Sequence, residues 1–443
     1  MEAQPGEAEQ EAPPLLELIL ELCPEDAEIS SADVYRATAR LPLENVDWLG
    51  FSLQPLGFGI NLVLATCHLL QAPGAPEPDD ILEAILALPC VQAVKLKRSR
   101  FVDESDMDPY DLCWLSPPKP LPSDGVPARC GLVSTFRDAP CLSSWVRFHR
   151  AVGFSRIWLY VDAPSADSAE ALAVAEEHAG VVSVVPRDEE LYKAWEQLAG
   201  WKKYGYLVDA VGDHSAVMAR QCLNGEHAAT LAEAEGITWL LHSDVDELCC
   251  PMHAGSDVGT LFGQAEKAGA NTIVFPNHEV APETEGPYPD PFREANLFKV
   301  NERLRSPGEG VSRFLAYGNG KSAVRVGGGV RPDGVHKWNL VSPAVLLMNP
   351  DDCCLLHFVN CGFDAIARKY EILGNFKDKW FGREISSSTP FHIAARDAAQ
   401  AGHDALLDLY RQRVMYDDTK ATELLSEGAL IRVDVPARLL AMA

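Results

Sequence analysis

The chain has 443 residues, with 38 lysines and arginines against 64 aspartates and glutamates, and a formal net charge of −26 at pH 7. Its composition, 47% hydrophobic and 23% charged, is that of a globular protein and excludes a fibrous or largely disordered chain. The negative charge makes general binding to nucleic-acid phosphates or anionic membrane surfaces unfavourable, so we expect no nucleic-acid partner.

The sequence also lacks the marks of membrane insertion and export. No apolar stretch approaches the ~20 residues that a membrane-spanning helix needs. The opening residues, MEAQPGEAEQEAPP, have neither the basic start nor the apolar core of a secretory signal. The 12 cysteines include adjacent pairs but no CxxC motif, which is typical of reduced thiols. These features predict a cytoplasmic protein without a membrane span.

The first part of the chain predicts a small α+β domain over residues 14–103. Residues 1–13 are acidic and lack apolar periodicity, so we expect a disordered leader there. Patterns of alternating strand and helix follow at residues 15–22 (strand), 32–41 (helix), 61–70 (apolar run), 78–88 (helix) and 91–97 (strand). This order suits a small sheet covered by helices on one face.

A Pro-rich linker at residues 104–128 separates this domain from a second one. Strands and helices then alternate at residues 130–136 (strand), 143–152 (helix), 156–161 (strand), 167–178 (helix) and 181–185 (strand). The alternation predicts a Rossmann-like, mostly parallel sheet, whose ligands bind at the carboxyl ends of the strands. Residues 389–443 have a helical pattern, and we expect a helical extension on the outside of this domain.

The sharpest local feature is the segment 237–248, ITWLLHSDVDEL, in which an apolar strand ends in Asp244, Asp246 and Glu247. Carboxylates this close repel one another unless a cation or solvent relieves them. A hard divalent ion that bridges them to a substrate diphosphate is one possibility. A solvated turn with Asp244 as a local cap is the other. The spacing alone leaves both open, since a second Asp-x-Asp occurs in the linker at Asp106 and Asp108.

A series of ordered blocks is more specific than any single motif. In chain order, the segments CGLVSTFRDAPCLSSWVRFHRAVGFSRIWLYVDAP, MARQCLNGEHAA, ITWLLHSDVDELCCP, GKSAVRVGGGVRPDGVHKW and LLHFVNCGFDAIARKYEIL resemble the glycosyltransferases of family 92 and the related family-2-like enzymes. The matching positions are Phe136-Arg137-Asp138, Trp145 and His149, Tyr160 and Asp162, Arg220-Gln221, and Asp244-Val245-Asp246-Glu247. The resemblance extends over residues 130–380.

This resemblance implies a GT-A glycosyltransferase domain at residues 129–388 that transfers a sugar, as an inverting hexosyltransferase, from a nucleotide-sugar donor to an unknown acceptor. It also implies a divalent ion, Mn²⁺ or Mg²⁺, that stabilises charge on the departing nucleoside diphosphate. The residues it assigns to the donor are Thr135, Arg137, Asp138, Asp162, Arg220 and Asp244. Those it assigns to the metal are Asp244, Asp246 and His357. An inverting transfer needs a carboxylate base, for which Glu279 and Glu247 are the candidates.

Some of these residues have simpler alternatives. His357, within LLHFV, can equally be a satisfied core histidine. Lys321, in the Gly-rich stretch GNGKSAVRVGGGVRPDG, can clamp phosphates or lie in a solvated loop. We expect Cys249 and Cys250 to pack rather than bind metal, because adjacent cysteines cannot easily bring both sulfurs to one ion.

The small domain has a resemblance of its own. Trp48, residues 55–60 (PLGFGI), Asp79-Asp80 and residues 91–94 (VQAV) are similar to the ferredoxin-like guanine-nucleotide exchange domain of elongation factor one beta. This implies elongation factor one alpha as a partner. Phe101 stands where that family has its functional lysine, so a module that only packs or tethers is the other interpretation. The alternative to a glycosyltransferase is therefore a translation-linked binding or exchange protein with a non-catalytic C-terminal domain.

Overall fold

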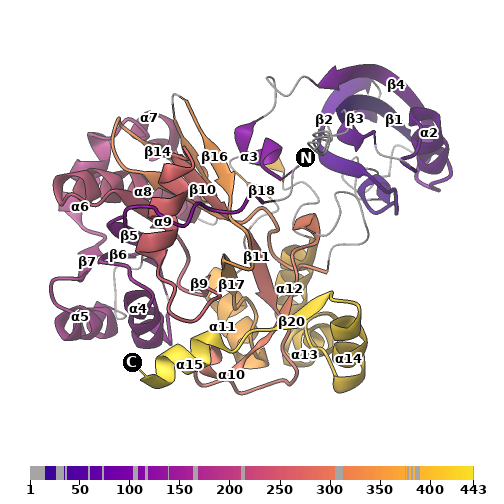
Figure 1. Cartoon of the computed structure of the whole chain (residues 1–443). Coiled ribbons are helices and arrows are strands. Elements are labelled where there is room, and N and C mark those ends of the chain that lie inside the picture. Colours follow the sequence, from indigo (N-terminus) through magenta and orange to yellow (C-terminus); the bar gives the residue numbers. More distant parts are fainter. Residues whose placement is uncertain are drawn as a thin grey trace, which may run out of the picture. The chain divides into compact units, whose positions relative to one another are not determined.

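The computed structural model describes residues 15–25, 34, 37–57, 60–71, 74–102, 108–114, 118–137, 139–162, 168–210, 215–304, 313–340, 342–374, 376, 379–380, 383–384 and 390–442 (Figure 1). These residues form two compact units. The first comprises the described residues up to 114 and the short turn Glu302–Leu304, and the second comprises the described residues from 118 onward apart from that turn. The division falls within the Pro-rich stretch 104–128.

The first unit is a four-stranded antiparallel sheet in the order β2-β3-β1-β4. Its strands are β1 (Leu15–Pro24), β2 (Val46–Gly57), β3 (Ile60–Leu70) and β4 (Val91–Val102), with helix α2 (Pro78–Leu86) between the last two. The even-numbered leucines of β1, from Leu16 to Leu22, are buried with Ile81 and Ile85 of α2, as the alternation in the sequence predicts. The α+β, ferredoxin-like class is confirmed.

The expected elements of this unit differ from the structure in two ways. Strand β2 is missing from the sequence-based expectation, and most of the expected helix 32–41 lies outside the described residues. The expected leader, residues 1–13, lies outside them as well. Phe101 pairs with Leu16 in the sheet. This pairing does not test whether the unit binds a partner, so elongation factor one alpha stays a prediction. A short helix, α3 (Pro109–Leu112), completes the unit, and Asp108 caps it by accepting a hydrogen bond from the backbone N–H of Tyr110 at 3.0 Å.

The second unit is built on a seven-stranded sheet in the order β16-β10-β13-β8-β5-β6-β7. The strands are β5 (Cys130–Phe136), β6 (Arg156–Val161), β7 (Val182–Pro186), β8 (Trp239–His242), β10 (Thr272–Phe275), β13 (Lys321–Arg325) and β16 (Val345–Leu347). Strands β8, β5, β6 and β7 are parallel neighbours, as are β10 and β16, whereas β13 runs opposite to β8 and β10. The Rossmann-like, mostly parallel α/β class is confirmed.

Helices cover both faces of this sheet, which explains why β5 is buried along its whole length. One face packs against α4 (Leu142–Ala151), α5 (Ser168–Glu177) and α9 (Val258–Lys267). The other packs against α6 (Glu189–Glu196), α7 (Trp201–Tyr204), the 3-10 turn η2 (Gly205–Leu207) and the long helix α8 (Ser215–Ala234). The result is a three-layer α/β/α arrangement (Figure 1).

A second, five-stranded sheet in the order β20-β12-β11-β17-β9 continues from the first. Its strands are β9 (Glu247–Pro251), β11 (Asn277–Val280), β12 (Leu297–Lys299), β17 (Cys353–His357) and β20 (Leu430–Arg432). The chain passes from β8 to β9 through residues 243–246 and from β10 to β11 through Pro276. The acidic segment thus lies where the chain crosses between the two sheets.

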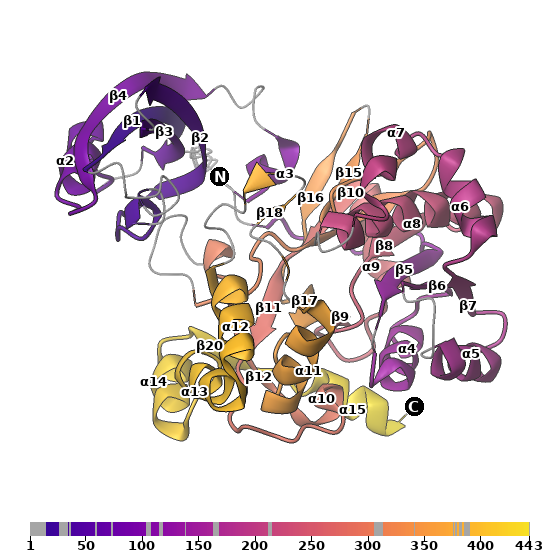
Figure 2. The same ribbon diagram turned by 180° about the vertical axis from the view of Figure 1, so that it is seen from behind.

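Helices of the C-terminal part surround the second sheet (Figure 2). They are α10 (Pro291–Glu294), α11 (Phe363–Leu373), α12 (Pro390–Ala401), α13 (His403–Arg413), α14 (Asp418–Ser426) and α15 (Val435–Met442). Two small hairpins, β14 (Arg331–Asp333) with β15 (Lys337–Asn339) and β18 (Lys379–Trp380) with β19 (Arg383–Glu384), complete the unit. The expected helical extension over residues 389–443 also contains β20, which pairs with β12.

Two general properties concern the chain as a whole. Within the described residues no helix has both the length and the apolar character needed to cross a bilayer. All 12 cysteines are free thiols. Cys249 and Cys250 are buried in the core with Cys353 and Cys354, the packing role that the sequence predicts for the first pair.

Candidate active site

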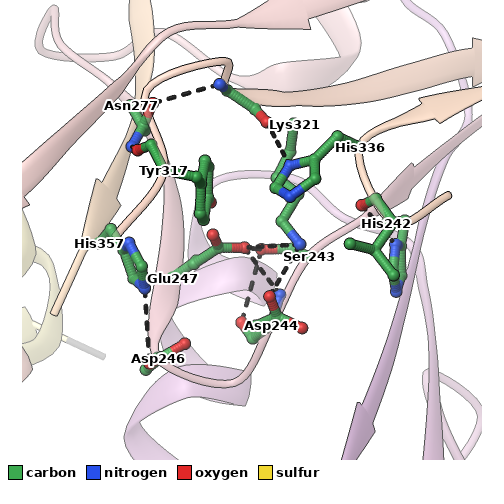
Figure 3. Close-up of polar contacts among 12 residues, drawn as sticks. His242, Ser243, Asp244, Asp246, Glu247, Asn277, Tyr317, Lys321, His336 and His357 are labelled. Atoms are coloured by element: carbon green, nitrogen blue, oxygen red, sulfur yellow. Dashed lines mark hydrogen bonds and ion pairs between the residues drawn. The ribbon is translucent and has the colours of Figure 1, made fainter. Parts of the chain in front are cut away.

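The acidic segment lies at the carboxyl end of β8, in the loop that leads into β9 (Figure 3). The backbone N–H of Ser243 donates to the carbonyl of Val133 at 3.1 Å, so the loop starts as a continuation of the β5–β8 pairing. Asp244 and Asp246 have side chains that are 29% and 45% exposed, whereas Glu247 is fully buried. Two of the three carboxylates therefore reach the surface, and the third lies beneath them.

Glu247 fixes the shape of this loop. Its Oε2 atom accepts hydrogen bonds from the backbone N–H of Asp244 at 2.8 Å and from the hydroxyl of Ser243 at 3.1 Å. Burial raises the pKa of Glu247 to about 7, helped by Asp244 and opposed by the nearby Lys321 ammonium. Its contacts make Glu247 a positioning residue for the backbone of Asp244.

Helix α4 holds the strand that follows the loop. The indole Nε1 of Trp145 donates to the carbonyl of Glu247 at 2.7 Å, and Nε2 of His149 accepts from the N–H of Cys249 at 3.1 Å. Since Nε2 accepts, Nδ1 of His149 carries the proton and donates to the carbonyl of Trp145 at 2.9 Å. Both rings are fully buried, and burial lowers the pKa of His149 to about 3. The Trp-x-x-x-His element thus supports the backbone behind the acidic loop.

Lys321, the first residue of β13, brings a positive charge to the loop (Figure 3). Its Nζ atom lies 2.7 Å from Oδ2 of Asp244 and 4.0 Å from Oε2 of Glu247, and its side chain is 1% exposed. The amide of Gln221 donates to the other oxygen of Asp244 at 2.8 Å. Burial acts to raise the pKa of Asp244, but Lys321 and His242 lower it below its usual range. Asp244 is therefore ionised and held from two sides.

Asp246 pairs instead with His357, the last residue of β17. The distance between Oδ2 of Asp246 and Nε2 of His357 is 3.6 Å. The carbonyl of Asp246 also accepts from the N–H of Phe358 at 2.8 Å, which ties the loop to the end of β17. Burial acts to lower the pKa of His357, but Asp246 outweighs it and the pKa is raised. The pKa of Asp246 is lowered, because His357 outweighs the effect of burial there.

The expected metal ligands Asp244, Asp246 and His357 do not form one ligand set. The structure brings Asp246 and His357 together, but both oxygens of Asp244 are engaged by Lys321 and Gln221. In the part of the chain that is described, no group of three or more His, Cys, Asp or Glu side chains is arranged to hold a metal ion. As arranged, these residues do not fit a divalent ion, because the Lys321 ammonium already engages Oδ2 of Asp244.

Four of the six residues assigned to the donor, Thr135, Arg137, Asp162 and Arg220, lie at or against the ends of β5 and β6. Asp162 accepts from Nε of Arg137 at 2.6 Å and from Nη2 of Arg220 at 2.9 Å, with a second, short contact from Nε of Arg220. Asp162 and Arg220 are buried, whereas the Arg137 side chain is 37% exposed. Thr135 accepts from the amide of Asn224 at 2.9 Å. Asp138 lies outside the described residues.

Helix α8 joins these groups. Arg220 contacts Asp162 after β6, Gln221 contacts Asp244 after β8, and Asn224 contacts Thr135 at the end of β5. Gln221 and Asn224 were not among the expected site residues. Gln221 belongs to the Arg220-Gln221 block, and the same block could have pointed to Asn224, because residues three and four positions apart on a helix face the same side.

Glu279, one of the two expected bases, is placed away from solvent. It is fully buried in β11 and forms an ion pair with Lys299, which is 1% exposed. Its carboxylate also accepts from the backbone N–H groups of Leu315 at 2.9 Å and Ala316 at 2.9 Å. Both oxygens are therefore occupied, whereas a general base needs a free oxygen that the acceptor can reach. The surroundings of Glu279 therefore indicate a structural role, in place of the expected role as general base.

Three buried polar atoms beside the loop have no hydrogen-bond partner within the described residues: Oε1 of Glu247, Nδ1 of His357 and the hydroxyl of Tyr317. The ring of Tyr317 lies between the rings of His336 and His357, at centroid distances of 4.4 and 5.1 Å (Figure 3). Buried polar atoms without partners are rare in folded proteins. Their concentration here indicates a place where a water or a hydroxyl group of a ligand completes the hydrogen bonding.

A cavity lies elsewhere in the second unit, among helices α11, α12 and α13. Its volume is about 430 Å³, and its lining includes Phe363, Tyr370, Glu371, Arg396 and His403. None of its lining residues belongs to the cluster around residues 243–247. We therefore treat it as separate from the candidate active site.

No protein-family model matches the chain. It is similar to two Arabidopsis thaliana proteins: Glycosyltransferase-like At3g57200, with 28% identity over 71% of this chain and 63% of that protein, and Glycosyltransferase-like At2g41451, with 26% identity over 70% of this chain and 71% of that protein. The chain thus spans less than two thirds of the first relative.

Among solved structures, the mannosyltransferase Ktr4p from S. cerevisiae overlaps 40% of this chain and 48% of its own, at 10% identity and a TM-score of 0.25. That score is too low to support an argument about fold or activity. The two plant relatives support the resemblance to glycosyltransferases at a general level. Membership of family 92 and the likeness to the elongation factor one beta exchange domain stay predictions.

Proposed function

We propose that the protein is a glycosyltransferase that moves a sugar from a nucleotide-sugar donor to a hydroxyl group of an acceptor. The observation that carries this proposal is the gathering of Asp244, Asp246 and Lys321 at the carboxyl edge of a Rossmann-like sheet, where such sheets bind ligands. Similarity to glycosyltransferase-like proteins over 71% of the chain supports the choice of reaction.

The reaction moves one glycosyl group. The acceptor oxygen forms a bond to the anomeric carbon, and the bond from that carbon to the donor's phosphate oxygen breaks. The electron pair of the broken bond leaves with the nucleoside diphosphate, and the acceptor's proton passes to a base. We propose a single displacement, which inverts the configuration at the anomeric carbon and needs one carboxylate at the acceptor side.

Asp246 is the carboxylate that we propose as this base. Its side chain is 45% exposed, whereas Glu247 and Glu279 are fully buried. Its lowered pKa keeps it ionised at neutral pH, so that it can accept a proton. His357 lies 3.6 Å from its Oδ2 atom and orients the carboxylate. The neighbouring unpartnered atoms of Tyr317 and His357 are suited to hold the acceptor hydroxyl.

On the donor side we assign the diphosphate to the end of β5, where Arg137 presents a guanidinium group that is 37% exposed. Arginine binds phosphate oxygens through two parallel hydrogen bonds, which suits this task. Asp162 and Arg220 hold Arg137 in place, since Asp162 bonds to both arginines. The guanidinium group of Arg137 is thus a positive charge at the carboxyl edge of the sheet that a nucleotide-sugar donor can reach.

The test is a screen of common nucleotide sugars with hydroxyl acceptors, in which release of the nucleoside diphosphate is measured with excess EDTA and with added Mn²⁺. We expect release from at least one donor, and we expect Asp246→Asn to lower the rate by about 10²-fold or more, as loss of a general base does. Asp408→Asn, an exposed change on α13, is the matched control and should leave the rate unchanged. Release by Asp246→Asn at the wild-type rate would remove Asp246 from this role.

A further inference from the structure

Each carboxylate in and behind the acidic loop has a basic side chain as its partner. Lys321 lies 2.7 Å from Asp244 and 4.0 Å from Glu247. His357 lies 3.6 Å from Asp246, and Lys299 contacts Glu279. Buried carboxylates are stable when they are paired in this way. The negative charge of the cluster is therefore balanced mainly by side chains of the chain itself.

Lys321 is held firmly in this position. It is the first residue of β13, where it pairs with Phe275 of β10 in the middle of the large sheet. Its side chain is 1% exposed, and its ammonium group lies 5.5 Å from the centre of the Tyr317 ring. These contacts fix the ammonium group beside two carboxylates.

We propose that Lys321 is the resident cation of the candidate active site and takes the place that a divalent ion would need beside Asp244. An ion bound to Asp244 and Asp246 would share Asp244 with the ammonium group, and two positive charges would then compete for one carboxylate. The site therefore binds no divalent ion, and glycosyl transfer there proceeds in its absence. Lys321 is a positioning residue, since its buried side chain acts through Asp244.

Binding of Mn²⁺ tests this on the full chain without any substrate. The electron paramagnetic resonance signal of free Mn²⁺ is measured as the ion is titrated into wild type, Asp246→Asn and Lys321→Met. We expect wild type and Asp246→Asn to leave the same fraction of Mn²⁺ free. We expect Lys321→Met to retain one additional Mn²⁺ per chain, and the double variant with Asp246→Asn to release it.

Two variants serve as controls. Lys203→Met removes a lysine that is 59% exposed and pairs with Asp333, and it should bind Mn²⁺ as wild type does. Lys321→Arg keeps the positive charge and should exclude the ion as well. Binding of one Mn²⁺ by wild type that Asp246→Asn releases would overturn the proposal. A Lys321→Met variant that folds but binds no additional Mn²⁺ would overturn it as well. If Lys321→Met does not fold, Lys321→Gln is titrated in its place. The wild-type titration decides the question in either case.

The activity part of the inference rests on the proposed function. With a donor in hand, turnover in excess EDTA should match turnover in Mn²⁺ within about twofold, whereas loss of turnover in EDTA would overturn it. If no donor is turned over under any condition, the proposed function fails, but the Mn²⁺ titration still tests the role of Lys321. The two failures are therefore distinguishable.

Discussion

At the scale of single residues, His149 shows how a buried neutral side chain supports the site from behind. Its two ring nitrogens bond to backbone groups of α4 and β9, and the ring is fully buried. Protonation would place a charge in the core and break the bond that Nε2 accepts from Cys249. The backbone behind the site therefore depends on the protonation state of His149, although the His149 ring is buried away from the surface.

This coupling predicts a pH dependence of stability. In the unfolded chain a histidine has a pKa of about 6.5, whereas burial lowers the pKa of His149 to about 3. Below pH ~6.5 the unfolded state binds the extra proton, so the free energy of unfolding should fall as pH falls, by up to about 1.4 kcal/mol per pH unit for this group.

Urea unfolding between neutral and mildly acid pH measures this slope. His149→Asn should show a shallower slope than wild type, although its stability at neutral pH is lower because hydrogen bonds are lost. The comparison of slopes isolates His149 from other buried histidines such as His278, which both proteins contain. Equal slopes would show that His149 does not remain neutral in the folded state.

The sequence identified part of the site at this scale. Asp244, Asp246 and Glu247 are neighbours in the chain, so their proximity could be predicted from the strand that precedes them. Lys321 lies 77 residues from Asp244, and its contact depends on the pairing of β13 with β8. No local pattern contains that information. Glu279 was misjudged for the same reason, because its partner Lys299 comes from the neighbouring strand β12.

At the scale of elements, the second sheet carries a row of charged side chains across its strands. Register pairs Glu247 of β9 with His357 of β17, His357 with Glu279 of β11, and Glu279 with Lys299 of β12. Paired residues in neighbouring strands share one face of the sheet. All of them are buried, so this row of side chains runs from the acidic loop through the interior of the second sheet to β12.

This arrangement predicts that Lys299→Met destabilises the protein strongly. The change leaves Glu279 as a buried carboxylate without its counter-charge, which costs about 3–5 kcal/mol in comparable cases. The double variant Lys299→Met with Glu279→Gln should recover much of that loss, because the buried charge is then absent. Urea unfolding of the wild type, the single variant and the double variant measures both effects. A single variant as stable as wild type would contradict the proposed balance of charges.

Prediction of the elements succeeded where strands are long or fully buried. The expected ranges 130–136 and 156–161 coincide with β5 and β6. Strand β2 was missed because Pro55 and Gly57 interrupt its pattern, which a sheet tolerates at an edge position with irregular register. The second sheet was missed because its strands are short, β12 having three residues, and each pairs with distant parts of the chain.

At the scale of the whole molecule, the two units have separate hydrophobic cores. The core of the first unit contains leucines of β1, apolar residues of β3 and the buried face of α2. The residues around the candidate active site belong to the second unit. Activity, if it depends on that site, should therefore not require the first unit.

This separation predicts the behaviour of a shortened protein. A chain that starts at Pro118 keeps every strand of both sheets of the second unit, so it should fold and turn over the donor at a rate close to that of the full chain. Circular dichroism, thermal melting and the nucleotide-release assay measure this. A shortened chain that folds but has lost turnover would show that the first unit contributes to the site.

The reversed direction of β13 has a consequence for how the site tolerates change. Because β13 runs against its neighbours, its first residue lies at the edge where β5, β6 and β8 end. Lys321, which carries the ammonium group, is thus part of a strand of the large sheet. Asp244 and Asp246 lie on the loop between the two sheets. Removing one residue from within the strand would turn the ammonium to the opposite face of the sheet. The direction and register of β13 therefore decide on which side of the carboxylates the positive charge lies.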